Sequence, residues 1–130
     1  MDRPDTLEVL IADDSEDLRQ RVRRLLAGLD GVEIRGEATD AEEAITLAAH
    51  HPFDVAILDI QMPGSGIRAL KHLRRDHPSL RIVMLTNHAD AFYYRICMRA
   101  GADFFLDKSM EFDRLPHVFQ RIKTGNALAV

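Results

Sequence analysis

Acidic residues and one lysine stand directly after apolar runs of the sequence. Residues 7–12 are followed by Asp13 and Asp14, residues 55–58 by Asp59, and residues 104–106 by Asp107 and Lys108. If each run is a strand of an open parallel sheet, the runs end at one shared edge, which is where ligands bind in such sheets. The pattern therefore predicts one pocket with a cation, a nucleophilic carboxylate and a positive charge for an anion. The chemistry that this predicts is phosphoryl transfer to Asp59.

The negative charges of Asp13, Asp14 and Asp59 would lie close together in this pocket. The three carboxylates repel one another, so at least one binds a proton more readily unless a divalent cation offsets the charge. Asp59 then attacks phosphorus and becomes an acyl phosphate. Lys108 and Thr86, which ends a further apolar run, are expected to donate to the phosphoryl oxygens, over which charge spreads in the transition state.

The composition of the chain excludes several classes of protein. The chain has 130 residues, 46% apolar and 29% charged, and no apolar run long enough for a bilayer. Its net charge of −4 argues against a nucleic-acid surface over the whole domain. Residues 1–6 lack the features of a secretory signal, and the single Cys97 fits a reducing compartment. We expect one cytoplasmic domain over residues 1–130, with a core at about 6–125.

Five apolar runs alternate with segments of helical period, which predicts a βα repeat around a parallel sheet. Strands are expected at residues 7–12, 32–38, 55–59, 82–86 and 104–106. Residues 32–38 alternate apolar and mostly polar side chains, so this strand is placed at the sheet edge.

Helix ends carry their own signals. Ser15 is the expected N-cap of the first helix and Gly31 its stop. In the last helix, Asp113 is the expected N-cap, which puts Pro116 in the first turn, where its missing N–H costs little.

The pattern at Asp13, Asp14, Asp59, Thr86 and Lys108 resembles the receiver domain of two-component response regulators, over nearly the whole chain. The supporting strings are VLIADD at 9–14, LDIQMPG at 58–64 and AGADFFLDKS at 100–109. The resemblance implies an α/β, flavodoxin-like (βα)5 three-layer sandwich with a parallel sheet of order 2-1-3-4-5.

The resemblance also implies a magnesium site. Asp14 and Asp59 hold Mg²⁺ through their carboxylates, Asp13 acts through water, and Gln61 adds its backbone carbonyl. Oxygen ligands with retained water suit such a hard cation. Asp59 is then the phosphoacceptor for a sensor histidine kinase or a histidine phosphotransfer protein.

A switch follows from the same resemblance. Thr86 is drawn toward the new phosphoryl group, and Phe105 rotates into the space behind it. The face formed by the fourth helix, the strand at 104–106 and the last helix then changes shape for a downstream protein effector. A second copy of the chain could bind through this same face to form a homodimer. Direct contact with nucleic acid or a membrane is not expected.

Two further positions are expected to tune the lifetime of the phosphorylated state. Gln61 and His88 stand two residues after Asp59 and Thr86, where the family places the side chains that flank the hydrolytic water. The spacing of the six histidines favours no zinc site. In residues 63–66, the second glycine stands one residue closer to the proline than the family usually has it, which predicts a tight loop.

The sequence leaves three alternatives open. The chain can be a receiver domain separated from a longer DNA-binding regulator; because the sequence stops after the last helix, we favour a stand-alone adaptor. A haloacid dehalogenase-type phosphatase needs an aspartate where Gln61 stands, and glutamine cannot shuttle a proton. A flavodoxin is disfavoured because Asp13 and Asp14 would repel an anionic flavin phosphate. We expect a signalling switch that catalyses only its own phosphorylation and dephosphorylation, and no other enzyme activity.

Overall fold

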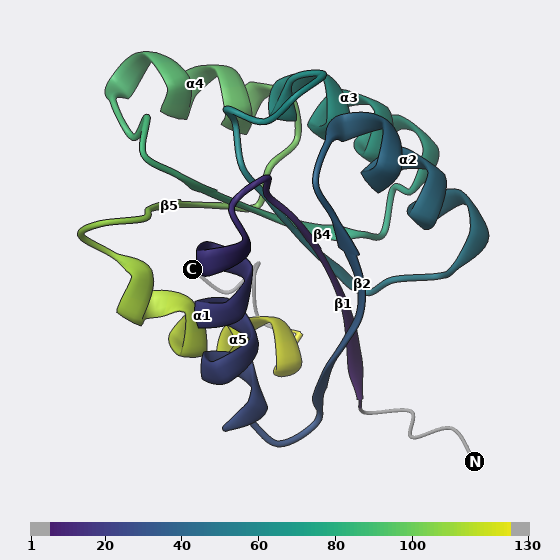
Figure 1. The fold of residues 1–130 in the computed structure, drawn as a ribbon, viewed down its shortest axis with the longest axis vertical. Coiled ribbons are helices and arrows are strands. Elements are labelled where there is room, and N and C mark those ends of the chain that lie inside the picture. Colours follow the sequence, from purple (N-terminus) through teal and green to yellow (C-terminus); the bar gives the residue numbers. More distant parts are fainter. Residues whose placement is uncertain (1–5, 126–130) are drawn as a thin grey trace.

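The computed structural model describes residues 6–125. The strands are β1 Leu7–Ala12, β2 Val32–Ala38, β3 Val55–Leu58, β4 Arg81–Thr86 and β5 Phe104–Asp107; the helices are α1 Glu16–Ala27, α2 Ala41–His50, α3 Gly66–Asp76, α4 Ala91–Arg99 and α5 Leu115–Lys123, with a 3-10 turn η1 at Phe112–Arg114. All strand pairs are parallel and the order is β2-β1-β3-β4-β5. The predicted flavodoxin-like fold is confirmed (Figure 1). The predicted domain, residues 1–130, extends beyond the described part at both ends.

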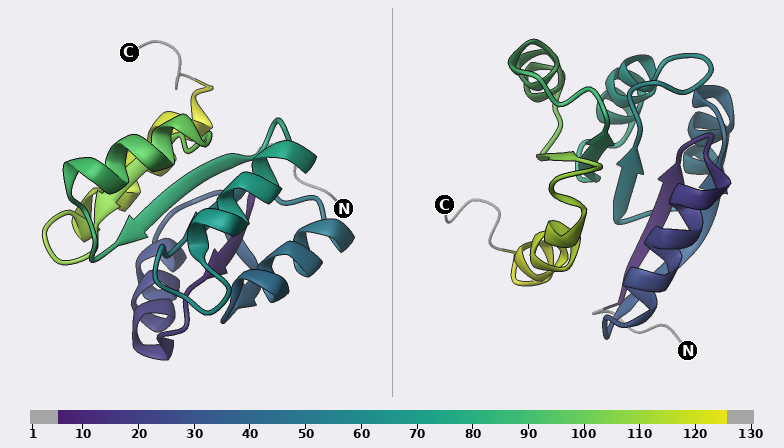
Figure 2. Two further views of the ribbon diagram at one scale, coloured as in Figure 1. Left: turned by 90° about the horizontal axis from the view of Figure 1, so that it is seen from above. Right: turned by 60° about the vertical axis from the view of Figure 1, so that its left-hand side comes forward.

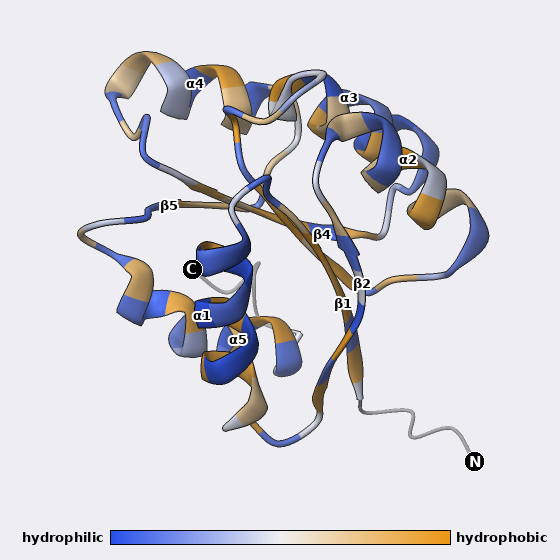
Figure 3. Cartoon of the chain, viewed as in Figure 1, coloured by the Kyte–Doolittle hydropathy of each residue, from blue (hydrophilic) through white to orange (hydrophobic). Residues whose placement is uncertain are grey.

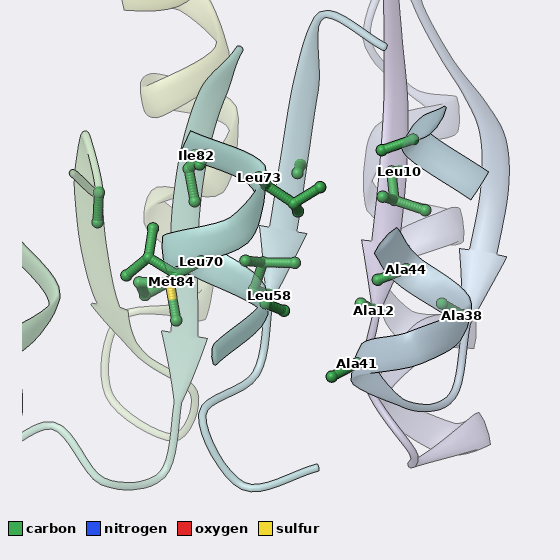
Figure 4. Packing of buried hydrophobic residues seen from close by; sticks show 14 of the residues in the cluster. Leu10, Ala12, Ala38, Ala41, Ala44, Leu58, Leu70, Leu73, Ile82 and Met84 are labelled. Carbon is green, nitrogen blue, oxygen red and sulfur yellow. The ribbon is translucent and has the colours of Figure 1, made fainter. Parts of the chain in front are cut away.

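Helices cover both faces of the sheet. Figures 1 and 2 show α1 and α5 on one face and α2, α3 and α4 on the other. Successive strand residues point to opposite faces, so Val9 and Ile11 of β1 belong to the core under α1 and α5. Leu10 belongs to the core under α2 and α3, where Leu70 and Met84 also pack (Figure 4). The sheet is thus buried on both faces.

Sequence hydropathy matches these layers. The central strands β1, β3 and β4 are nearly continuous buried runs, as parallel strands covered on both faces require. Figure 3 shows β1 and β4 as largely hydrophobic, whereas α1 is mostly hydrophilic. β2 alternates buried and exposed residues and lies at the sheet edge, as predicted. Among the described residues, we find no helix with the length and apolar character to span a bilayer.

The start of α1 was predicted correctly and its end was not. The Ser15 hydroxyl accepts a hydrogen bond from the N–H of Leu18, as an N-cap does. The helix ends at Ala27 with Gly28 as C-cap, and not at Gly31. Gly31 has a φ of 71°, and its carbonyl accepts from the N–H of Leu7 at 2.8 Å. It therefore forms the turn that leads into the edge strand β2 and does not stop the helix.

The predicted N-cap of the last helix is also wrong. Asp113 lies inside η1 and α5 follows directly at Leu115, with no side-chain cap on either. The N–H of Leu115 donates instead to the carbonyl of Phe112. The 3-10 turn thus takes the place of a side-chain cap at the start of α5. Pro116 occupies the first turn, as expected.

Candidate functional site

Two adjacent strands bring the acidic residues together. Ala12 of β1 is in register with Leu58 of β3, so Asp13 and Asp59 follow at the same level of the sheet. The N–H of Asp59 continues the ladder by donating to Ala12 at 3.0 Å. This is the point where the strand order reverses, the usual ligand site of such sheets. One oxygen from each of Asp13, Asp14 and Asp59 lies within 4.8 Å of the others.

The three acids differ in burial. Asp13 and Asp59 are 2% and 4% exposed, whereas Asp14 faces solvent. This arrangement can hold a metal ion with oxygen ligands and leaves one side open to solvent.

Lys108 reaches into this cluster from the end of β5. Its ammonium nitrogen lies 2.7 Å from Oδ2 of Asp13 and 3.3 Å from Oδ2 of Asp59. Its backbone N–H donates to the carbonyl of Thr86 at 2.9 Å, which fixes the start of the side chain. The four residues that the sequence placed at strand ends therefore meet, with the amine directed toward the phosphoacceptor candidate.

The environment of Asp59 disfavours its charged form. Burial raises the pKa of the Asp59 carboxyl, and the nearby charge of Asp13 raises it further. Lys108 and the backbone N–H of Gln61 act in the opposite direction and only partly offset these effects. Additional positive charge in the pocket would favour the ionised carboxylate.

Thr86 ends β4 with its side chain fully buried. Its hydroxyl accepts from the N–H of His88 at 3.0 Å, which leaves its own proton free to donate. It does not cap α4, because Asp90 accepts from the N–H of Tyr93 in that role. The side chains of His88 and Gln61, the two expected tuning residues, are exposed.

Phe105 lies on the same face of the sheet as Thr86, since it pairs with Met84, two residues earlier in β4. Its ring is half-buried and packs edge-on against Tyr94, with ring centroids 5.5 Å apart and planes at 84°. These two rings and Met110 line a cavity of about 430 Å³ between α4 and β5. The Phe105 ring thus borders open space on the side of α4.

The loop between β3 and α3 is tight, as expected. Gly64 and Ser65 have φ values of 83° and 77°, and the N–H of Gly66 donates to Ile60 at 2.9 Å. A Cβ on Gly66 would lie 1.7 Å from the carbonyl oxygen of Asp59. Only glycine lets α3 begin this close to the Asp59 backbone.

Sequence reasoning missed one residue next to the pocket. Arg19 is 8% exposed, and its Nη1 donates to the backbone carbonyl of Asp13 at 2.5 Å. A signal was present: Arg19 precedes Val22 and Leu26 by three and seven positions, which puts it on the apolar face of α1.

The family of the chain follows from comparison with known proteins. Residues 9–120 match the family model of the response regulator receiver domain. The chain therefore belongs to the response regulator receiver domain family, as the strand-end residues indicated.

Curated relatives are longer response regulators, and the matched region is about half of each. GacA of Pseudomonas viridiflava is 35% identical over 104 residues, which cover 78% of this chain and 48% of GacA. UvrY of Escherichia coli K12 is 34% identical over 103 residues, covering 78% of this chain and 47% of UvrY. The chain spans about half the length of the curated relatives it matches.

Solved structures share the fold. A LuxR-family response regulator from Aurantimonas has a TM-score of 0.86 at 30% identity, with 92% of this chain and 86% of that chain covered. The isolated receiver domain of RcsB from Salmonella enterica gives 0.87 at 26%, covering 92% and 90%. The response regulator domain of CheB from Thermotoga maritima gives 0.81 at 28%, covering 96% and 98%.

Proposed function

We propose that this receiver domain accepts one phosphoryl group on Asp59 from a sensor histidine kinase or a histidine phosphotransfer protein. One observation carries the proposal: Asp59 is buried, lies within 4.8 Å of two other carboxylates and has the Lys108 amine at 3.3 Å. Family membership supports the same chemistry.

The donor set fits Mg²⁺ as the cofactor. Carboxylate oxygens, an open side for water and no nitrogen or sulfur ligand suit a hard cation. Asp14 and Asp59 would hold the ion through carboxylates and Asp13 through water, with the backbone carbonyl of Gln61 as a further ligand. When bound, the ion supplies positive charge that offsets the crowded acids and the incoming phosphoryl dianion.

In the transfer step, a carboxylate oxygen of Asp59 forms a bond to phosphorus as the P–N bond of phosphohistidine breaks. The electron pair of the broken bond returns to the imidazole nitrogen. The Lys108 ammonium and the Thr86 hydroxyl donate to the phosphoryl oxygens, where charge spreads in the transition state. Thr86 is suited to this because the N–H of His88 already occupies its acceptor side.

The same contacts would drive a switch. A phosphoryl group on Asp59 draws the Thr86 hydroxyl toward it, and Phe105 leaves its packing against Tyr94 to fill the space behind. The surface of α4, β5 and α5 then favours one of two arrangements, which a downstream protein effector reads. The position of Phe105 on the same sheet face as Thr86, with a half-buried ring held at its outer side by Tyr94, supports this proposal.

Gln61 and His88 tune the lifetime of the phosphorylated state in this proposal. Both side chains are exposed beside the pocket. Replacing both by alanine and measuring the rate of autodephosphorylation tests the idea, and an unchanged rate would remove it.

The output of the whole protein is a separate proposal, because the match covers only about half of each relative. A stand-alone adaptor and the receiver part of a longer regulator share all the chemistry above. In both, this domain signals by protein contact and is no turnover enzyme; Gln61 at the phosphatase acid/base position supports this.

We propose a single domain over residues 1–130, supported by the family match at 9–120. The cytoplasm, where Cys97 stays reduced, is the proposed location.

Mass spectrometry after incubation with Mg²⁺ and a small phosphoramidate donor tests the function. We expect one added phosphoryl group on the wild-type chain and none on Asp59→Asn. Asp107→Asn is the matched control, because it changes another strand-end acid outside the cluster and should keep the modification. Modification of Asp59→Asn would contradict the proposal.

A further inference from the structure

Arg19 of α1 is a buried charge next to the acidic pocket but outside it. Only 8% of the residue is exposed, and a buried guanidinium is costly unless it is paired and hydrogen-bonded. Its nitrogens reach three segments: Nη1 donates to the backbone carbonyl of Asp13 at 2.5 Å, Nε to Glu37 at 3.1 Å, and Nη2 to Glu16. It therefore ties the turn after β1 to β2 and to α1.

The charge of Arg19 is balanced within this group. Arg23, one turn later in α1, donates to the same acids, to Glu37 at 2.6 Å and to Glu16 at 2.9 Å. Two arginines and two glutamates thus form a network without net charge. The contact of Arg19 with Asp13 is to the main chain and not to the carboxylate, so its effect there is on geometry.

The two acids of the β1–α1 turn are held differently. The Asp13 side chain has its own anchors, the Lys108 amine at 2.7 Å and the N–H of Ser15 at 2.9 Å. Asp14 is exposed, and within residues 6–125 its carboxylate accepts no hydrogen bond. Its direction therefore depends on the peptide that joins it to Asp13, whose carbonyl Arg19 holds.

We propose that Arg19 is a positioning residue for the divalent cation: by fixing the Asp13 carbonyl, it aims the Asp14 carboxylate into the site. The inference rests on the proposed magnesium site. Groups that orient metal ligands from outside change metal affinity by roughly 10- to 100-fold when they are removed.

A positioning role and a purely electrostatic role of Arg19 predict opposite changes in magnesium affinity when Arg19 is removed. If Arg19 acted only through its charge, its removal would strengthen cation binding, since a positive charge near the site is lost. If it positions Asp14, its removal weakens binding. Arg23 is the matched control, because it sits on the same helix and binds the same glutamates but makes no hydrogen bond to Asp13.

The experiment is calorimetric titration with MgCl2 alone on the wild type, Arg19→Met and Arg23→Met, each shown to be folded by urea unfolding. We expect about tenfold weaker binding for Arg19→Met, and affinity equal to or above that of the wild type for Arg23→Met. Unchanged or tighter binding in Arg19→Met overturns the proposal, and so does equal weakening in both variants. Absence of magnesium binding to the wild type would instead overturn the metal site itself.

A double-mutant cycle separates positioning from general damage. In an Asp14→Asn background the ligand that Arg19 aims is already lost, so Arg19→Met should weaken binding by less than about twofold further. A full additional loss contradicts the proposal. If Arg19→Met does not fold, Arg19→Lys replaces it, because an ammonium cannot supply the planar fork that bonds the carbonyl and both glutamates. Wild-type affinity in that variant would then overturn the proposal.

Discussion

The ammonium nitrogen of Lys108 lies 2.7 Å from Oδ2 of Asp13, closer than its 3.3 Å to Asp59. The lysine thus occupies the carboxylate cluster in the same region where a cation is proposed to bind. Its two expected effects are separable. It competes with a cation for the acids, and it donates to the phosphoryl group on Asp59.

Replacing Lys108 by methionine should separate these effects. We expect phosphorylation by a small phosphoramidate to slow by about 100-fold, as when one transition-state donor is removed. Magnesium affinity should be unchanged or higher, because a competing positive charge is gone. A time course followed by mass spectrometry measures the phosphorylation rate, and calorimetry measures the magnesium affinity. Lys71→Met, at an exposed position of α3, is the control; weaker magnesium binding in Lys108→Met alone would contradict the assignment.

Replacing Asp59 by asparagine should stabilise the domain when magnesium is absent. Burial, with the charge of Asp13, raises the pKa of Asp59 above its ordinary value of 3.8. As pH rises from 3.8 through the folded-state pKa, the folded state keeps a proton that the unfolded state releases, so wild-type stability falls and stays lower above that pKa. Asp59→Asn avoids this loss and should gain on the order of 1 kcal/mol near neutral pH.

Urea unfolding in the presence of a chelator measures this gain in stability. It is done once near neutral pH and once near the ordinary carboxyl pKa. The difference between variant and wild type should shrink in acid, where both states of the wild type carry the proton. Asp30→Asn, an exposed acid in the loop before β2, should show no such difference. A gain that is independent of pH would point to a cause other than the buried charge.

A methyl group at Gly66 should damage both stability and phosphorylation. The added Cβ would meet the Asp59 carbonyl at 1.7 Å, so the backbone of the phosphoacceptor must move. We expect Gly66→Ala to cost about 2–3 kcal/mol in urea unfolding and to slow phosphorylation. In Gly28→Ala the Cβ meets its nearest neighbour at 3.6 Å with helical φ, so this control should be neutral or slightly stabilising. Equal stability of both variants would show that the loop can relax.

The sequence was sufficient for the sheet and for the pocket. A parallel sheet covered on both faces needs continuous apolar strands, and such strands end at one edge, so Asp13, Asp59 and Lys108 were predictable as neighbours. The edge position of β2 followed from its alternation of exposed and buried residues.

Helix ends and buried charge were harder to predict, because they depend on tertiary contacts. Gly28 and Gly31 carry the same local stop signal, and the hydrogen bond from Leu7 to Gly31 gives the second glycine its role in the edge strand. Arg19 is buried because Glu37 of the neighbouring strand pairs with it. The place of Arg19 on the apolar face of α1 indicated burial, but its partner Glu37 stands 18 residues away in the sequence and is brought to it only by the fold.

Cys97 offers a direct measure of how firmly α4 is packed. Within Ala91–Arg99 it is the buried residue, and burial raises the pKa of its thiol to about 11. Near neutral pH the native protein should therefore react with a maleimide at least about 100-fold more slowly than the urea-unfolded chain, since both access and the thiolate fraction are low. Cys97→Ser should take up no label, because the chain has a single cysteine. Rapid labelling of the native state would mean that α4 detaches often, and a changed rate with a phosphoryl mimic would place α4 among the elements that switch.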